Sequence, residues 1–147
     1  MRSRVDHPLA LIGIFIWLGA VFAISFLEAW LKFRAPGVTL AIGLGIGRLV
    51  FSALNNLEWI LAIVIVASFS FGGSKFSEKA NLLVFFVICL LMLQTFWLLP
   101  SLDRRAGLVI AGENLAASNL HIYFIAAEIL KVLTLLMAGI LNFKKDR

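Results

Sequence analysis

Four long apolar runs, separated by short polar connections, set the pattern of hydrophobic and polar positions along this chain. A helix needs about 20 residues to cross the hydrocarbon core of a bilayer, and each run reaches that length. Both alternating sets of positions within a run are apolar, unlike those in the strands of a membrane barrel. We therefore predict an all-α fold, an integral membrane four-helix bundle, with spans at approximately residues 9–31, 49–71, 78–99 and 120–141.

Turn signals indicate where the helices end. A proline-glycine turn at residues 35–37 follows the first run. From 40 to 71 nothing forces a break, and a helix of that length is longer than a bilayer core requires. The second helix should therefore either project beyond the hydrocarbon or kink at the glycines of residues 43–47. The third is expected to stop at Pro100, and residues 106–141 are again continuously compatible with a helix.

The composition supports a single membrane domain. Hydrophobic residues make up 62% of the 147 residues and charged residues 14%, against about 45–50% and about 25% in a soluble domain. A soluble protein of this size could not hide so much apolar surface in one core. We therefore interpret residues 1–147 as one transmembrane domain whose main partner is the lipid bilayer.

The net charge of +5 would suggest nucleic acid as a partner if the protein were soluble. Here the basic residues lie at the ends of the apolar runs, where they meet phospholipid headgroups, so no nucleic acid is expected. Four spans place both termini on one side of the membrane. That side carries seven basic residues, against four or five on the other. The bias predicts a multi-pass protein of the cell (inner) membrane with both termini in the cytoplasm.

Several charged and polar side chains lie within the runs, where a charge costs roughly 2.5–3.5 kcal/mol at the helix centre. Such residues need partners and are candidates for function. Asn114, His121 and Glu128 are seven residues apart, so a continuous helix would place them on one face, which Lys131 joins. The full candidate cluster is Glu28, Lys32, Arg48, Asn55, Glu58, Asn114, His121, Glu128 and Lys131.

A second polar stripe follows the second helix through Arg48, Asn55 and Glu58. That helix starts on the side where the first ends and the fourth begins, so we expect the two stripes to face one another. They should form a polar cluster inside the bundle that opens toward the side opposite the termini. The third helix is expected to contribute only Gln94 and Thr95.

The cluster contains no recognisable chemical motif. No ligand spacing is diagnostic of a metal, and no nucleophile, histidine and acid form a catalytic set. Any cofactor is therefore unknown, and the charges can equally be structural groups that fix packing and register. Gly43 and Gly47 form a G-x-x-x-G pair, which we interpret as a site of close helix packing.

One stretch carries a resemblance: residues 24–39, which include Glu28 and Lys32, followed by Ile46-Gly47-Arg48-Leu49-Val50-Phe51 and Ala53-Leu54-Asn55. With these motifs the chain resembles bacterial four-span membrane proteins of similar length that have no assigned activity. Its layout is also similar to the DUF4149-type family, which includes vertebrate transmembrane protein 205. The resemblance implies the four-span fold and no particular reaction.

The leading hypothesis is a membrane protein that binds or transports an ion or a small polar solute through the polar cluster. Glu58 and Glu128 would be the protonatable or cation-binding groups, and Arg48, Asn114 and His121 would position the ligand. Four spans are few for a transporter, so this hypothesis favours a homo-oligomer. The first alternative is an accessory or structural subunit that stabilises a membrane partner. The second alternative is a membrane enzyme acting on a lipid or quinone.

Overall fold

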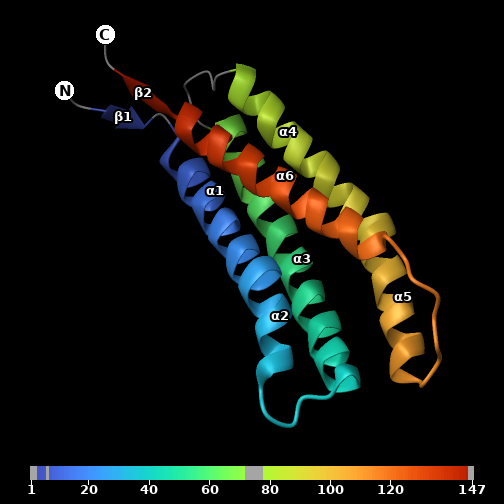
Figure 1. The fold of residues 1–147 in the computed structure, drawn as a ribbon. Coiled ribbons are helices and arrows are strands. Elements are labelled where there is room, and N and C mark those ends of the chain that lie inside the picture. The colour runs from blue at the N-terminus through green and yellow to red at the C-terminus, as the bar shows by residue number, and fades with distance from the viewer. Residues whose placement is uncertain (1–2, 6, 72–77, 146–147) are drawn as a thin grey trace.

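The computed structural model describes residues 3–5, 7–71 and 78–145, and its long helices lie side by side in a bundle (Figure 1). Within this part of the chain, four helical segments are long and apolar enough to cross a membrane: Pro8–Arg34, Leu40–Ser70, Lys79–Ile110 and Leu120–Leu141. The predicted all-α four-helix bundle is therefore confirmed.

The first segment changes its helical geometry along its length. It begins as α1 (Pro8–Val21), with proline in the first turn, where the missing N–H is not needed. It widens into a π-helix, η1 (Phe22–Glu28), and ends as α2 (Ala29–Leu31) and a 3-10 turn, η2 (Lys32–Arg34). The chain then turns at Gly37, whose φ of 80° favours glycine. The turn expected at residues 35–37 is present.

The second segment is one uninterrupted helix, α3 (Leu40–Phe71). The Thr39 hydroxyl accepts a hydrogen bond from the Ile42 amide at 3.3 Å, which caps the helix start. The glycines within residues 43–47 do not break α3. Of the two alternatives drawn from the sequence, the structure has the long continuous helix.

The third segment extends past its expected end. It consists of α4 (Glu78–Leu93), a π-helix η3 (Gln94–Leu98) and α5 (Leu99–Ile110). Pro100 does not stop the helix, because it lies in the first turn of α5, where its missing N–H costs no intrahelical bond.

The connection to the fourth segment differs from the expected continuous helix. Residues 106–119 do not continue a helix into α6 (Leu120–Leu141), because α5 ends at Ile110 and Gly112 has a φ of 90°. At the opposite end of the bundle, β1 (Ser3–Val5) pairs antiparallel with β2 (Phe143–Lys145), with Ser3 opposite Lys145. The termini therefore lie together at one end, called here the terminal end (Figure 1).

Helix neighbours change along the bundle. α1 packs against α3 and α6, and α4 packs against α6, whereas α5 packs mainly against α3 (Figure 1). Apolar side chains fill the terminal half, where Ile14, Ile65, Leu91 and Leu135 are all at most 1% exposed. The divergence of α5 from α6 leaves the other half of the bundle less tightly closed, and that half contains the pocket described below.

Candidate functional site

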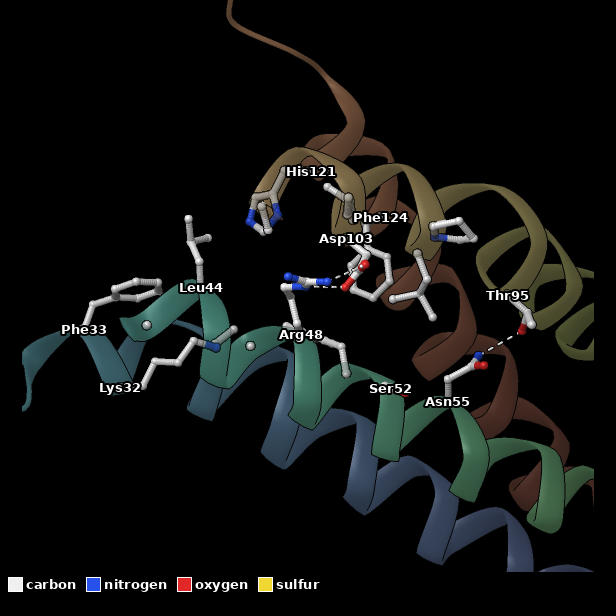
Figure 2. A pocket seen from close by; sticks show the side chains of 18 residues that line it. Lys32, Phe33, Leu44, Arg48, Ser52, Asn55, Thr95, Asp103, His121 and Phe124 are labelled. Atoms are coloured by element: carbon white, nitrogen blue, oxygen red, sulfur yellow. Dashed lines mark hydrogen bonds and ion pairs between the residues drawn. The ribbon is translucent and has the colours of Figure 1, made fainter. Parts of the chain in front are cut away.

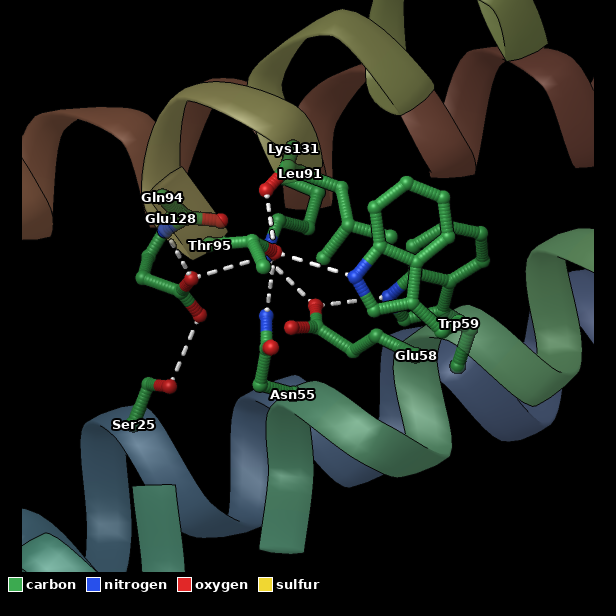
Figure 3. A network of polar contacts seen from close by, with 10 residues as sticks. Ser25, Asn55, Glu58, Trp59, Leu91, Gln94, Thr95, Glu128 and Lys131 are labelled. Carbon is green, nitrogen blue, oxygen red and sulfur yellow. Dashed lines mark hydrogen bonds and ion pairs between the residues drawn. The ribbon is translucent and has the colours of Figure 1, made fainter. Parts of the chain in front are cut away.

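An ion network lies buried in the middle of the bundle. Lys131 on α6 donates to Oε1 of Glu58 on α3 at 2.5 Å and to Oε1 of Glu128, one helical turn before it, at 2.8 Å. The three side chains are between 0% and 4% exposed (Figure 3). Charges this deeply buried are costly unless each is paired and hydrogen-bonded, so the surrounding structure must hold them closely.

Neutral donors from the remaining segments complete the ion network. Trp17 on α1 donates its indole N–H to Glu58 Oε1 at 2.8 Å. Gln94 on η3 donates to Glu128 Oε1 at 2.5 Å, and the Ser25 hydroxyl on η1 donates to Glu128 Oε2 at 2.7 Å. All four membrane-length segments therefore contribute a side chain to one hydrogen-bonded cluster (Figure 3).

Both π-helical segments face this network. Ser25 lies in η1 and Gln94 in η3, and each binds the same carboxylate, that of Glu128. A π turn inside an α-helix is rare and occurs frequently at functional sites. Two such turns at one level of the bundle indicate that the backbone is adapted to the position of these side chains.

The charges of the ion network do not cancel. Two carboxylates, Glu58 and Glu128, share one ammonium, Lys131, which leaves a formal excess of one negative charge when both acids are ionised. In addition, Gln94 Oε1 is buried and accepts no hydrogen bond from the described residues. A buried carbonyl without a donor costs free energy. The network therefore has capacity for an additional positive or hydrogen-donating group.

A smaller polar group adjoins the ion network. Asn55 on α3 donates its amide to the Thr95 hydroxyl at 2.9 Å, and Trp59 donates to the same oxygen at 3.0 Å (Figure 3). Thr95 in turn donates to the Leu91 carbonyl at 2.8 Å. Asn55 lies one helical turn before Glu58 on α3, so the two polar groups share a face of that helix.

A pocket of about 490 Å³ opens beyond Asn55, in the half of the bundle away from the termini (Figure 2). It lies between the end of the first segment, α3, the η3–α5 region and the start of α6. Asn55 and Thr95 form its inner end. Aromatic and aliphatic side chains, among them Phe33, Phe51 and Phe124, supply most of its walls. Its volume is in the range of about 300–1,000 Å³ that is usual for small-molecule sites.

Matched charge pairs lie along the outer part of the pocket. Arg48 on α3 binds Asp103 on α5 through two hydrogen bonds of 2.5 and 2.9 Å (Figure 2). Lys32 binds Glu28 at 3.0 Å, and its ammonium also lies 5.4 Å from the centre of the Phe51 ring. The Arg48–Asp103 pair joins α5 to α3, and the contact of Lys32 with the Phe51 ring joins the end of the first segment to α3. Because each cation is paired with an acid, the pocket mouth is close to neutral.

The sequence-predicted site residues fall into three groups. Asn55, Glu58, Glu128 and Lys131 converge in the bundle centre, and Glu28, Lys32, Arg48 and His121 lie at or beside the pocket. Asn114 joins neither group: it is exposed in the connection between α5 and α6. The stripe through Asn114 was wrong, because it assumed that the fourth helix begins before Leu120.

Sequence reasoning missed three partners of the predicted cluster. Asp103 lies beyond the expected helix end at Pro100, yet it is on α5 and pairs with Arg48. Trp17 and Ser25 carried no signal, because nothing in the spacing of the first run marks them as facing a carboxylate. Gln94 was expected near the site, but its bond to Glu128 depends on the π turn of η3.

Gly43 and Gly47 contact the first segment of the same chain. Both are buried, and a Cβ atom at Gly43 would collide with the Phe33 ring. A Cβ atom at Gly47 would lie 3.2 Å from the Lys32 ammonium. These two glycines therefore allow the close approach of the first segment to α3, which positions Lys32 at the pocket.

Metal binding has no obvious donor set here. In the ranges that the structure describes, no three His, Cys, Asp or Glu side chains are grouped so that they could hold a metal ion. Comparisons with protein-family models, with curated proteins and with solved structures found no match for this chain. The geometry of the site is therefore the basis for its proposed function.

Proposed function

We propose that this protein binds an ion or a small polar solute inside the membrane, in the pocket and at the ion network behind it. The observation that carries the proposal is the continuity between the two: Asn55 and Thr95 form the inner end of the pocket and adjoin Glu58. A purely structural ion network would have no need of a pocket leading to it.

Among the described residues, the pocket opens toward the side of the bundle away from the termini. Between the network and the terminal end, the buried side chains of the bundle are chiefly apolar, with Ile14, Ile65, Val87 and Leu135 among them. Such a core does not conduct an ion or a polar solute. Transport would therefore require the helices to move, and binding from the pocket side would be its first step.

Orientation belongs to the same proposal. With both termini in the cytoplasm of a cell with an inner membrane, as the basic residues favour, the pocket opens toward the opposite, external side. The solute would then arrive from outside. The pocket is lined by residues of one chain, so solute binding itself does not require a homo-oligomer.

A second candidate, an accessory subunit that stabilises a membrane partner, rests on one observation. Gly19 and Ala23 are exposed on the first segment, and a Cβ atom at Gly19 would meet nothing within 4 Å. Small residues spaced four apart on a lipid-facing surface allow a second helix to approach closely. Gly19→Leu would abolish copurification of a partner in this case and leave solute binding unchanged.

Thermal stability tests the first proposal. The purified protein is heated in detergent with sodium chloride, potassium chloride, ammonium chloride, sodium acetate or inorganic phosphate at constant ionic strength. We expect at least one of them to raise Tm in a saturable way, because a ligand bound only to the folded state stabilises it.

Two adjacent asparagines provide the matched pair of variants. Asn55→Leu removes a buried amide at the inner end of the pocket, whereas Asn56→Leu changes an exposed one. The rise in Tm should be lost in Asn55→Leu and kept in Asn56→Leu. An equal rise in both variants, or no rise with any of these solutes, would contradict the proposal.

A further inference from the structure

We infer that the ion network binds one exchangeable proton and that Glu58 carries it. This inference rests on the proposed function, since it names the ion for the inner part of the same site. The proton comes from a hydronium ion on the pocket side. One O–H bond of the hydronium breaks, an O–H bond forms with the second carboxylate oxygen of Glu58, and a water molecule remains; release to water is the reverse step.

The carboxylates of the network outnumber its cations. The charged groups of the network are Glu58 from α3 and Glu128 and Lys131 from α6. The side chains that face them from α1, η1 and η3 are neutral, namely Trp17, Ser25 and Gln94. One negative charge therefore lacks a counter-ion among the described residues, and an unpaired charge in the membrane interior is costly. A single bound proton makes the network neutral.

Charges elsewhere in the bundle do not change this balance. Lys32 is paired with Glu28, and Arg48 is paired with Asp103. His121 is exposed at the pocket and lies two helical turns before Glu128 on α6. Within the described residues, none of these groups forms a hydrogen bond or ion pair with the network, so they offer no cation that could replace the proton.

Hydrogen bonding decides which carboxylate holds the proton. Both oxygens of Glu128 accept bonds, Oε1 from Lys131 and Gln94 and Oε2 from Ser25. Neither oxygen of Glu128 is therefore free to take up a proton without displacing one of these three donors. Glu58 accepts both of its bonds on Oε1, and no described donor reaches its other oxygen. Glu58 is therefore the acid with an oxygen available for a proton.

The free oxygen of Glu58 also lies on the side from which a proton would arrive. In Figure 3 it points toward the amide of Asn55, which lines the inner end of the pocket. The opposite side of the network is closed by the apolar core around Ile14 and Ile65. Exchange therefore takes place through the pocket.

A metal cation fits the network less well than a proton does. Among the described residues, Gln94 Oε1 is a buried oxygen without a hydrogen bond, and the second oxygen of Glu58 accepts none of the bonds that hold its partner oxygen. Hard cations such as Ca²⁺ take about 6–8 oxygen ligands. The ammonium of Lys131 lies between the two carboxylates and repels a second cation. A proton needs one acceptor only.

Infrared spectroscopy of the whole protein in lipid vesicles tests the inference. At neutral pH we expect a carbonyl stretching band of a protonated carboxylic acid, which shifts to lower frequency in deuterated water. Glu58→Gln should abolish that band. The control Glu113→Gln, in the exposed connection before α6, should leave it unchanged. Absence of the band from the unmodified protein, or its persistence in Glu58→Gln, would overturn the inference.

Stability of the two acid-to-amide variants tests the choice of Glu58. An amide reproduces the shape and charge of a protonated acid, so Glu58→Gln should keep the Tm of the unmodified protein within a few degrees. Glu128→Gln replaces one of two accepting oxygens by an amide group that cannot accept a hydrogen bond, so it should lower Tm more. The reverse order of Tm values would overturn the choice. A band that is weak in sodium and grows when sodium is replaced by choline would overturn the inference, because a metal cation would then occupy the network in place of the proton.

The failure of this inference can be told apart from that of the proposed function. If the infrared band is absent but a solute still raises Tm in an Asn55-dependent way, the proposed function stands and the inference of a bound proton fails. If the band is present but no solute raises Tm, the proton on Glu58 stands and the proposal of solute binding in the pocket fails.

Discussion

Replacing Lys131 by methionine is the most informative perturbation of the bundle centre. Methionine keeps the length and flexibility of the side chain and removes only the ammonium. The variant loses hydrogen bonds of 2.5 and 2.8 Å to two carboxylates that are themselves buried. Neither acid has a second cation within the described part of the bundle, so both are left without a positive partner.

The expected cost follows from that environment. Removing one partner of a buried ion pair destabilises a protein by about 3–5 kcal/mol, because the remaining charge stays buried without compensation. We expect Lys131→Met to lower the free energy of unfolding by this amount. The triple variant that also carries Glu58→Gln and Glu128→Gln contains no buried charge in the network. It should recover most of the loss, since replacing a whole buried ion group is often close to neutral.

Unfolding by sodium dodecyl sulfate in mixed micelles, followed by circular dichroism, measures these differences. The matched control is Lys79→Met, which removes an exposed lysine at the start of α4 and should change stability by less than about 0.5 kcal/mol. A Lys131→Met variant as stable as the control would refute the reasoning. A triple variant less stable than Lys131→Met would also refute it, because the two acids would then stabilise the fold without the lysine.

Two further predictions concern the non-terminal half. Gly43→Ala should be less stable than Gly45→Ala by about 1 kcal/mol in the same unfolding assay. The reason is that a Cβ atom at Gly43 meets the Phe33 ring, whereas one at Gly45 meets nothing within 4 Å. Equal stabilities of the two variants would contradict this packing. Arg48→Ala should be strongly coupled to Asp103→Ala and additive with Glu128→Gln in double-mutant cycles, because Arg48 binds only the first of these acids; coupling to Glu128 instead would show that the pocket mouth and the ion network form one cluster.

The fold could be read largely from the sequence, since apolar runs long enough for a bilayer leave few alternatives. The ends of the helices could not. Pro100 looks like a helix stop, but the π turn before it places it in a first turn, where proline is tolerated. The stretch from 106 to 119 has no strong helix breaker apart from glycine, yet it leaves the helix at Ile110. Local propensity is a weak guide where tertiary packing decides.

The site was predictable in part, for a physical reason. Glu58, Glu128 and Lys131 stand out because a charge within an apolar run must find a partner, and the structure brings the three together. Their neutral partners do not stand out, because serine and tryptophan are ordinary residues in a membrane helix. Ser25 and Gln94 reach Glu128 from π turns, which no residue pattern in the sequence marks. The Asn114 error has the same origin, an assumed helix that the backbone does not form.

We expect the buried acid network to exchange protons with water through the pocket. Hydrogen–deuterium exchange of the Glu58 acid band tests it most directly, in a Cys89→Ser background with one new cysteine modified by a bulky maleimide. Ser52→Cys places the adduct in the pocket lining, and Ser70→Cys places it on an exposed position near the terminal end. We expect the adduct at position 52 to slow exchange at least severalfold and the adduct at position 70 to leave it unchanged. Equal exchange rates for both adducts, or slower exchange only with the adduct at position 70, would contradict it.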